Sequence, residues 1–367
     1  MTGSGRVGVG IVGAGTISDQ YLENLTAFGD LDVRFVADVD TARAASQAGK
    51  WGVPATGSYD ELLADDGIEI VVNLTIPAAH VEVALRAVQA GRHVWGEKPY
   101  ALDRTSARRL AAAARRRGVR VAVAPDTFLG AGLQTALRAV REGEIGEPLT
   151  ALTLFQIPGP ESWHPSPEFL YAKGGGPLFD VGPYYLTALV QVLGAVSRVS
   201  AASSRARRSR VIGSGPKAGT PFPVEVPTHV GALIEFAGGG SAQSIFSFDS
   251  PLRRAGLVEF AGTRGTVVFP DPNEFDGDTV VWGADGESRT IPANGSRYTR
   301  GTGVLELARA IRADRAERVP GALALHVLDV MTSIVESADL GRPVEVASRA
   351  DPSPLLEPGW DPASSTL

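Results

Sequence analysis

The sequence predicts an α/β domain with a doubly wound parallel sheet, followed by an α+β domain with an open, mainly antiparallel sheet. Short β-branched runs alternate with helical patterns over the first third of the 367 residues, as a parallel sheet with right-handed crossovers requires. Long alternating strands separated by glycine-rich turns dominate the later half, which indicates antiparallel pairing. The chain is also too long for one ordinary core, which favours two domains.

Each element of the first domain follows from its local pattern. Thr41 is expected to cap a helix, and Gly91 to end the next one. Strands are expected where apolar and β-branched residues cluster, at 6–12, 32–38, 68–75, 92–96 and 119–125. Helices are expected where apolar residues recur at helical spacing, at 18–28, 41–51, 78–91 and 104–118. One more helix, at about 130–143, is expected at the start of the second domain.

The second domain shows two hairpin patterns and a closing helix. "PTHVGALIEF" and "SAQSIFSFDS" flank "AGGG", and "LVEFAGTRGTVVF" contains a second turn. The closing helix is expected at about 321–340. These patterns predict domains at 1–125 and 126–367, and they allow the closing helix to pack back on the first domain. The segment 205–219, "RARRSRVIGSGPKAG", is a candidate loop with concentrated positive charge.

Composition excludes several classes of function. The net charge of -6 gives no general attraction to nucleic acid or to anionic membranes, and the short "RARRSR" cluster does not change this expectation. The absence of cysteine excludes disulfides, thiolate metal sites and a cysteine nucleophile, and it suits a cytoplasmic enzyme. No signal peptide and no run of about 18 apolar residues is found, so no membrane span is expected. No histidine and carboxylate spacing predicts a metal site.

The turn after the first strand carries a motif typical of dinucleotide binding. "VGAGTIS" fits G-x-G-x-x-S, with Gly13 for a tight turn, Gly15 for close approach of a pyrophosphate, and Ser18 as a small packing residue. Asp38 ends the second strand, about 20 residues on, where a carboxylate accepts from ribose hydroxyls and repels a 2'-phosphate. NAD is therefore favoured over NADP, although Arg43 lies nearby. The alternatives are an ordinary glycine turn and a helix cap at Asp38.

Two charged residues stand where the strand at 92–96 ends. "NLTIPAAH" (73–80) and "GEKP" follow neighbouring predicted strands, whose carboxyl ends should meet on the ligand side of the sheet. In a dry cleft beside a cofactor, the Lys98 amine would be competent in proton transfer. Pro99 restricts Lys98 to an extended backbone and could follow a cis bond. The alternative for Glu97 and Lys98 is a surface ion pair.

Four motifs together resemble the Gfo/Idh/MocA family of oxidoreductases. They are "GAGTIS", "NLTIPAAH", "GRHVWGEKP" and "GGGPLFDVGPYYLTAL", in an order and spacing that match over roughly residues 5–347. The resemblance implies a Rossmann domain, NAD(P)-dependent redox chemistry on sugars or polyols, Lys98 at the reacting hydroxyl, and Glu97 at the nicotinamide ribose. It also implies cofactor contacts from Thr16, Ile17, Thr75, Pro77 and His80.

The fourth motif departs from the family pattern, Asp-x-Gly-x-His-x-x-Asp. Asp180 and Gly182 match, but Tyr184 replaces the histidine and Thr187 the final aspartate. Tyr184 could transfer the proton if a nearby ammonium lowered its pKa, and Asp180 could orient it. The alternatives are a packing role for Tyr184 and an N-cap role for Asp180.

A loop before this motif offers a second proton carrier. In "ESWHPSPEF", Trp163 could stack on a sugar ring and His164 could act as acid or base in place of the missing histidine. The alternative is an exposed loop histidine. His80 is equally consistent with a place near the cofactor and with a helix face.

These residues predict an NAD-dependent oxidoreductase that transfers a hydride between nicotinamide and a hydroxyl or keto carbon of a sugar, polyol or sugar derivative. Two alternatives stay open: an NAD-dependent glycosidase or lyase that oxidises its sugar transiently with no net redox change, and a non-catalytic cofactor or sugar sensor. The resemblance also implies a homodimer or homotetramer formed through the second domain's sheet.

Overall fold

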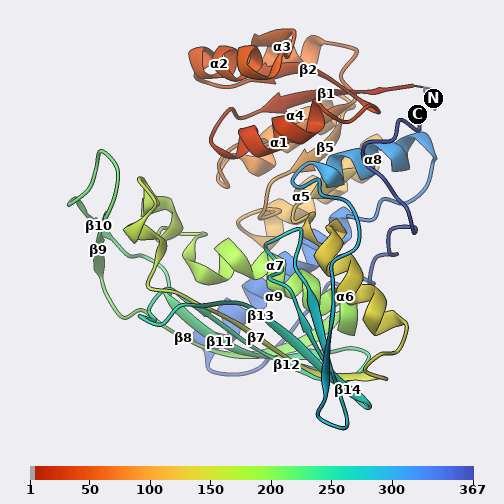
Figure 1. Cartoon of the computed structure of the whole chain (residues 1–367). Helices are drawn as coiled ribbons and strands as arrows, with labels where there is room; N and C mark the ends of the chain where they lie inside the picture. The colour runs from red at the N-terminus through yellow and green to blue at the C-terminus, as the bar shows by residue number, and fades with distance from the viewer. Residues whose placement is uncertain (1–4) are drawn as a thin grey trace. The chain divides into compact units, whose positions relative to one another are not determined.

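The computed structural model describes residues 5–367, which form two compact units (Figure 1). The first unit contains the chain up to Gly130 together with Gly295–Leu325 and Ser353–Leu367. The second contains Ala131–Asn294 and His326–Pro352. This division differs from the single boundary expected at residue 126, because two later segments of the chain join the first unit.

A six-stranded parallel sheet forms the centre of the first unit, with the strand order β3-β2-β1-β4-β5-β6. Because the order reverses at β1, right-handed crossovers place helices on both faces, which confirms the predicted doubly wound fold. All residues of β1 are buried, as a strand covered on both sides requires. The strands are β1 (Val7–Val12), β2 (Leu31–Ala37), β3 (Ala55–Gly57), β4 (Ile70–Asn73), β5 (His93–Gly96) and β6 (Val121–Val123).

Polar caps begin some of the helices of the first unit, and the sequence showed these caps only in part. Asp40, and not Thr41, caps α2 by accepting from the Arg43 amide at 3.1 Å, because the aspartate has the extended backbone that a cap needs. The strand β3 and the helix α3 were not expected; Ser58 and Glu61 form a capping box there. The helices are α1 (Ile17–Leu25), α2 (Thr41–Trp51), α3 (Tyr59–Ala64), α4 (His80–Gln89), α5 (Arg104–Arg117) and α8 (Thr302–Arg312).

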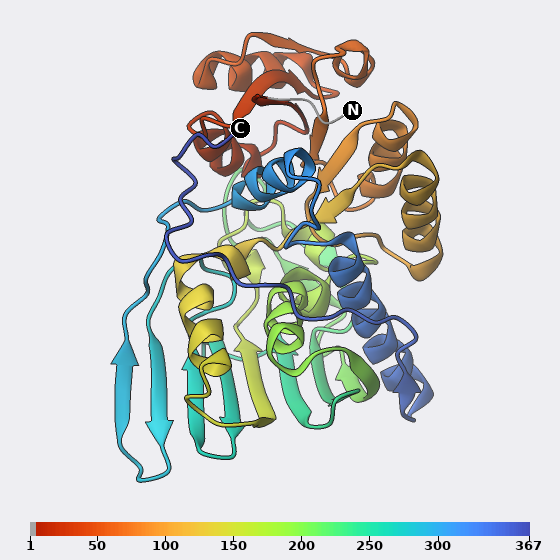
Figure 2. The ribbon, with the colours of Figure 1, turned by 90° about the vertical axis from the view of Figure 1, so that its right-hand side faces the viewer.

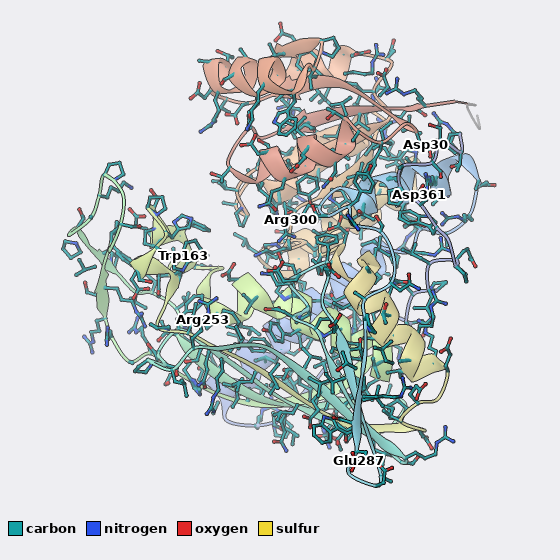
Figure 3. The ribbon with its side chains drawn as sticks, in the orientation of Figure 1. Asp30, Trp163, Arg253, Glu287, Arg300 and Asp361 are labelled. Carbon is teal, nitrogen blue, oxygen red and sulfur yellow. The ribbon has the colours of Figure 1, made fainter. Side chains whose placement is uncertain are left out.

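A buried ion pair attaches the later segments to the first unit. Arg309 of α8 donates from Nε to Asp30 Oδ2 at 2.8 Å, and both side chains are almost inaccessible. The same guanidinium donates to the carbonyl oxygen of Asp361, and the amide of Thr366 donates to Asp30. Figure 3 labels Asp30 and Asp361 at this junction. The C-terminal segment is irregular, but it is fixed by these bonds.

The second unit contains a nine-stranded sheet with the order β16-β15-β14-β13-β7-β12-β11-β8-β17. Figure 2 shows its green and cyan strands side by side. Its neighbours are antiparallel except for β7 and β12, so the expected mainly antiparallel sheet is confirmed, and so are both hairpins, β11–β12 and β13–β14. The strands are β7 (Pro148–Gln156), β8 (Val196–Ser204), β11 (His229–Phe236), β12 (Ser241–Ser247), β13 (Arg254–Gly262), β14 (Gly265–Phe269), β15 (Thr279–Gly283), β16 (Ser288–Ile291) and β17 (Val344–Glu345).

Helices cover one face of this sheet. Helix α7 (Gly176–Leu193) packs on β7, β11 and β12, and α6 (Ala131–Arg141) packs on β14 and β15. On alternate strand positions Leu152, Leu233 and Trp282 are exposed. The homo-oligomer expected through this sheet stays a prediction.

Helix α9 (Gly321–Leu340) was expected as the closing helix, and it is also more apolar than the sequence analysis allowed. By length and composition alone it could cross a membrane, with a mean hydropathy of 1.3 over 18 residues. However, 56% of that window is buried inside the structure, and the core helix of a protein passes the same test. Only its start, up to Leu325, belongs to the first unit.

Candidate active site

Four loops meet at the carboxyl end of the parallel sheet, because their strands end at the same level. The strand register pairs Val12 with Ala37 and with Asn73, and Asn73 with Gly96. The residues that follow these four positions include Gly13, Asp38, Thr75 and Glu97. This register confirms the prediction that the "NLTIPAAH" and "GEKP" segments lie at the same end of the sheet.

Gly13 makes the tight turn that the motif predicts, with φ of +100°. A Cβ atom at this position would lie 2.7 Å from the carbonyl oxygen of Leu74, so the turn also needs glycine because the end of β4 approaches it. At Gly15, by contrast, a Cβ atom would meet no atom of residues 5–367 within 4 Å. Gly15 thus borders open space, as a backbone that receives a ligand should.

The N-terminus of α1 is available to an anionic ligand. The side chain of Thr16, the residue before the helix, makes no capping hydrogen bond, so it leaves the first helical amides to other partners. Ser18 is fully buried; its hydroxyl donates to the Gly15 carbonyl at 2.6 Å and accepts from Gln47 at 2.9 Å. Ser18 is therefore small enough for close packing, and its hydroxyl also connects the turn to α2. Thr16 is exposed and Ile17 is half-buried.

Asp38 braces the same turn. Its Oδ2 accepts from the Ala14 amide at 2.7 Å, and its Oδ1 accepts from the Asp40 amide at 2.9 Å and from Arg43 at 2.8 Å. Burial alone would raise the pKa of Asp38, but the bonds from Arg43 and from the two amides outweigh burial and lower it. Because Asp40 caps α2, the alternative of Asp38 as the helix cap is wrong.

A cavity of about 640 Å³ extends from this turn along the sheet. Val39 and Ile76 expose apolar side chains at its wall, and Arg86 lies 4.7 Å from the centre of the Tyr59 ring. The lining residues also include Gly13, Gly15, Asp38, Arg43, Ser58 and Thr75. The cavity therefore offers apolar walls beside two guanidinium groups and two carboxylates, those of Asp38 and Asp60.

His80 joins the loops that follow β4 and β5. Its two ring nitrogens lie 2.9 Å from the Thr75 carbonyl oxygen and 3.0 Å from the Pro99 carbonyl oxygen, and the side chain is buried. Thr75 in turn donates from its hydroxyl to Asn73 at 2.6 Å. His80 thus braces the two loops at the first residue of α4. Pro77, half-buried in the same loop, accepts from the His80 amide at 3.4 Å.

Glu97 and Lys98 follow β5 directly, and the peptide bond between Lys98 and Pro99 is cis. Glu97 Oε1 accepts from the Tyr21 hydroxyl at 2.7 Å, and Oε2 accepts from the Lys98 amide at 3.0 Å. The Tyr21 oxygen also accepts from Trp95 at 3.2 Å. Glu97 is therefore anchored to α1, and this anchor fixes the backbone from which the Lys98 side chain extends.

Asp126 is a fully buried carboxylate that the sequence analysis missed. Its Oδ2 accepts from the amides of Gly301 and Gly303 at 3.1 and 2.9 Å, so it caps α8, which lies far along the chain. Its Oδ1 is buried and has no hydrogen-bond partner among the described residues. Burial raises the pKa of Asp126 to about 6. The sequence could have pointed to Asp126 by its position just after β6, on the carboxyl side of the sheet.

In the second unit, Asp180 and Tyr184 lie four residues apart on α7, so they share one face of that helix. Gly175 precedes the helix as its cap position, and Asp180 is the fifth helical residue. The N-cap alternative for Asp180 is therefore wrong. Tyr184 is 5% exposed, so most of its ring packs inside the second unit. Its neighbour Tyr185 is a packing residue whose hydroxyl accepts from the Gly256 amide at 2.7 Å.

Trp163 and His164 follow the short helix η2 (Pro160–Ser162), in the loop that Figure 3 marks with Trp163. The Trp163 side chain is 61% exposed, and its ring lies edge-on to His164 at 5.5 Å. His164 also contacts the ring of Phe169, at the same distance. His164 Nδ1 accepts from the Ser166 amide at 3.0 Å, so in the neutral ring the proton is on Nε2. Among residues 5–367, no group of three or more His, Cys, Asp or Glu side chains is placed to hold a metal ion.

A doubly wound sheet with a glycine turn, an acidic residue after the second strand and an open helix N-terminus defines the class of dinucleotide-binding oxidoreductases. The family model "Oxidoreductase family, NAD-binding Rossmann fold" matches residues 7–125, and "GFO/IDH/MocA C-terminal domain" matches residues 133–268. The chain belongs to the Gfo/Idh/MocA family of oxidoreductases, as its motifs indicated.

Characterised relatives show the range of this family. The chain is 29% identical over 315 residues to trans-1,2-dihydrobenzene-1,2-diol dehydrogenase of Sus scrofa, covering 83% of this chain and 86% of that protein. It is 33% identical over 218 residues to dTDP-3,4-didehydro-2,6-dideoxy-alpha-D-glucose 3-reductase of Streptomyces antibioticus, covering 58% and 65%. A structure of levoglucosan dehydrogenase in complex with NADH and L-sorbose aligns with a TM-score of 0.81 at 22% identity, covering 94% and 99%, which shows the shared fold.

Proposed function

We propose that this protein is an NAD-dependent dehydrogenase or reductase that acts on a hydroxyl or keto carbon of a sugar, polyol or sugar derivative. The observation that carries the proposal is the meeting of the glycine turn, Asp38 and the Glu97–Lys98 pair at one end of one parallel sheet. The sugar class is supported by the names of relatives, one a reductase of a dTDP-linked sugar and one a dehydrogenase solved with L-sorbose.

The residues present fit a dinucleotide. Gly15 borders open space and α1 lacks a side-chain cap, which suits a pyrophosphate. Asp38 lies in the wall of the cavity, where it would hold the adenosine ribose, and the exposed apolar side chains of Val39 and Ile76 line the same cavity. When bound, NAD would supply the hydride acceptor or donor of the reaction.

The chain's own residues would move the proton of the reacting hydroxyl. Lys98, held on a backbone that Glu97 fixes, is the proposed group at that hydroxyl. Tyr184 on α7 and His164 in its aromatic loop are the proposed carriers of the proton to solvent, and Asp180 would orient Tyr184 from the same helix face. Positioned acid–base groups of this kind typically accelerate a reaction about 10²–10⁴-fold.

The choice between NAD and NADP depends on the carboxylate of Asp38. We expect Asp38→Ser to weaken NADH binding about tenfold, because one charge-assisted hydrogen bond of about 1.5–3 kcal/mol is lost. The same change should strengthen NADPH binding, because the negative charge is gone and Arg43 loses its partner. Fluorescence titration of both cofactors would measure the ratio.

Asp40→Asn is the matched control, because asparagine caps a helix about as well as aspartate. It should leave the preference between the two cofactors unchanged. An Asp38→Ser protein that binds NADPH no better than the wild type does would contradict this account of the cavity.

The proposed activity can be tested on the full chain with NAD and a panel of monosaccharides, polyols, 1,5-anhydro sugars and glycosides. Formation of NADH with a sugar or polyol is the expected result. Release of a cleavage product without net NADH would instead support the redox-neutral glycosidase or lyase. Tight cofactor binding without any turnover would support the sensor.

A further inference from the structure

A buried arginine lies directly behind the Trp163–His164 loop. Arg210 is the central residue of β9 (Ser209–Val211), which pairs with β10 (Pro221–Pro223) in a separate two-stranded sheet. Its side chain is 2% exposed, although the neighbouring arginines of the "RARRSR" run are exposed. The loop predicted over 205–219 is therefore wrong at this position, where the chain forms a strand. A guanidinium is buried only where several acceptors surround it.

Those acceptors belong to two separate segments of the second unit, 158–161 and 248–249. Arg210 pairs with the carboxylates of Glu161 and Asp249, and it donates to the carbonyl oxygens of Pro158 and Phe248 at 2.9 and 2.8 Å. Its guanidinium also lies 5.1 Å from the centre of the Tyr171 ring. The Tyr171 hydroxyl donates to Glu161, and the Thr228 hydroxyl donates to Asp249. One cation thus holds together two carboxylates that would otherwise face each other in a buried site.

These contacts fix the backbone on both sides of Trp163. Gly159 has φ of +116°, and a Cβ atom there would collide with the Glu161 carboxylate, the Arg210 guanidinium and the Tyr171 hydroxyl. Also before Trp163, the Gly213 amide donates to the Glu161 carbonyl at 2.7 Å. After Trp163, a Cβ atom at Gly215 would lie 2.6 Å from Pro165. The β9–β10 segment therefore supports the loop through close backbone contact.

The loop that this segment supports exposes aromatic side chains to solvent. Trp163 and Phe169 are 61% and 52% exposed, and both rings contact His164. Beneath them, Tyr171 packs in a buried cluster with Phe222 and Phe248. Aromatic rings that are already held in place lose little conformational entropy when they bind the apolar face of a sugar ring.

We propose that Arg210 is a positioning residue that determines substrate affinity and specificity by holding the Trp163–His164 loop in its binding conformation. This inference depends on the proposed function, in which that loop contacts the sugar. Without Arg210, Glu161 and Asp249 would repel each other, and the loop would lose its attachment at Pro158 and Glu161. Binding of the sugar would weaken, while the cofactor cavity in the first unit would be unaffected.

The test compares Arg210→Met with Arg208→Met, a control that removes an exposed arginine from the same run. In the full chain, Arg210→Met should raise KM for the sugar at least about tenfold and leave the Kd of NADH unchanged. It should lower kcat as well, because His164 moves with the loop. Hydrogen exchange in peptides covering residues 158–171 should become faster. Arg208→Met should match the wild type in all four measurements.

A role in folding alone would lower the active fraction, and therefore the apparent kcat, at an unchanged KM; that result would overturn the proposal. If Arg210→Met does not fold, Tyr171→Phe removes only the hydroxyl that bonds Glu161 and should shift KM and exchange in the same direction by a smaller factor. Failure of the proposed function would appear as a wild-type protein that turns over no sugar. Failure of this inference would appear as wild-type exchange of residues 158–171 in Arg210→Met.

Discussion

Replacement of Lys98 by methionine should lower kcat with the sugar about 10²–10⁴-fold, the range typical of a positioned acid–base group. Methionine keeps the apolar stem of the side chain and removes only the ammonium. The fold of the loop should survive, because Glu97 anchors it through Tyr21 and the Lys98 amide, and neither bond involves the Lys98 side chain. The Kd of NADH, measured by fluorescence titration, should change little in comparison with the loss in kcat.

Two further variants make this prediction sharper. Lys50→Met removes an exposed ammonium that pairs with Asp19, and it should leave kcat unchanged. Lys98→Arg keeps a positive charge but cannot release a proton at neutral pH. A Lys98→Arg enzyme with wild-type kcat would show that position 98 supplies charge alone, and a Lys98→Met protein with full activity would contradict its catalytic role.

The parallel sheet could be predicted because its signals are local. Glycine turns, β-branched runs and amphipathic helices each occupy a few neighbouring residues, and β1, β4 and β5 lie where those signals placed them. The sequence also indicated that Gly13 must be glycine for its turn. It could not show the second reason, the approach of Leu74, because that contact depends on the pairing of two strands.

The features that sequence analysis missed depend on contacts between distant segments. Arg309 and Asp30 join residues 279 positions apart, so α8 could not be assigned to the first unit from its own pattern. Arg210 stands in a charged run whose other arginines are exposed, and only the three-residue strand β9 turns it inward. Short strands of this kind carry too few residues for their alternation to be recognised.

The second large effect concerns Asp126 and the pH dependence of stability. In the folded protein burial raises the pKa of Asp126 from 3.8 to about 6, with the charge of Glu97 adding to the increase and that of Arg300 opposing it. The folded state therefore favours the neutral carboxyl. Below about pH 4 this contribution to stability is fully present, and it is lost as the pH rises through about 6, because the folded state must then hold a buried charge.

Asp126→Asn should remove this dependence. The asparagine oxygen can accept from Gly301 and Gly303 as the carboxylate does, so the cap of α8 is kept without a charge. A difference of about two pKa units corresponds to about 3 kcal/mol. The variant should therefore gain up to about 3 kcal/mol over the wild type at pH 8 and less than about 1 kcal/mol at pH 4.

Urea midpoints of the two proteins at pH 4 and pH 8 would measure this difference, with Asp351→Asn, an exposed carboxylate, as the control. Comparison of variant with wild type at each pH cancels the titration of all other groups. Midpoints that run parallel over this range would mean that Asp126 carries no buried charge. A widening gap would show that the fold maintains a destabilising carboxylate whose charge interacts with that of Glu97.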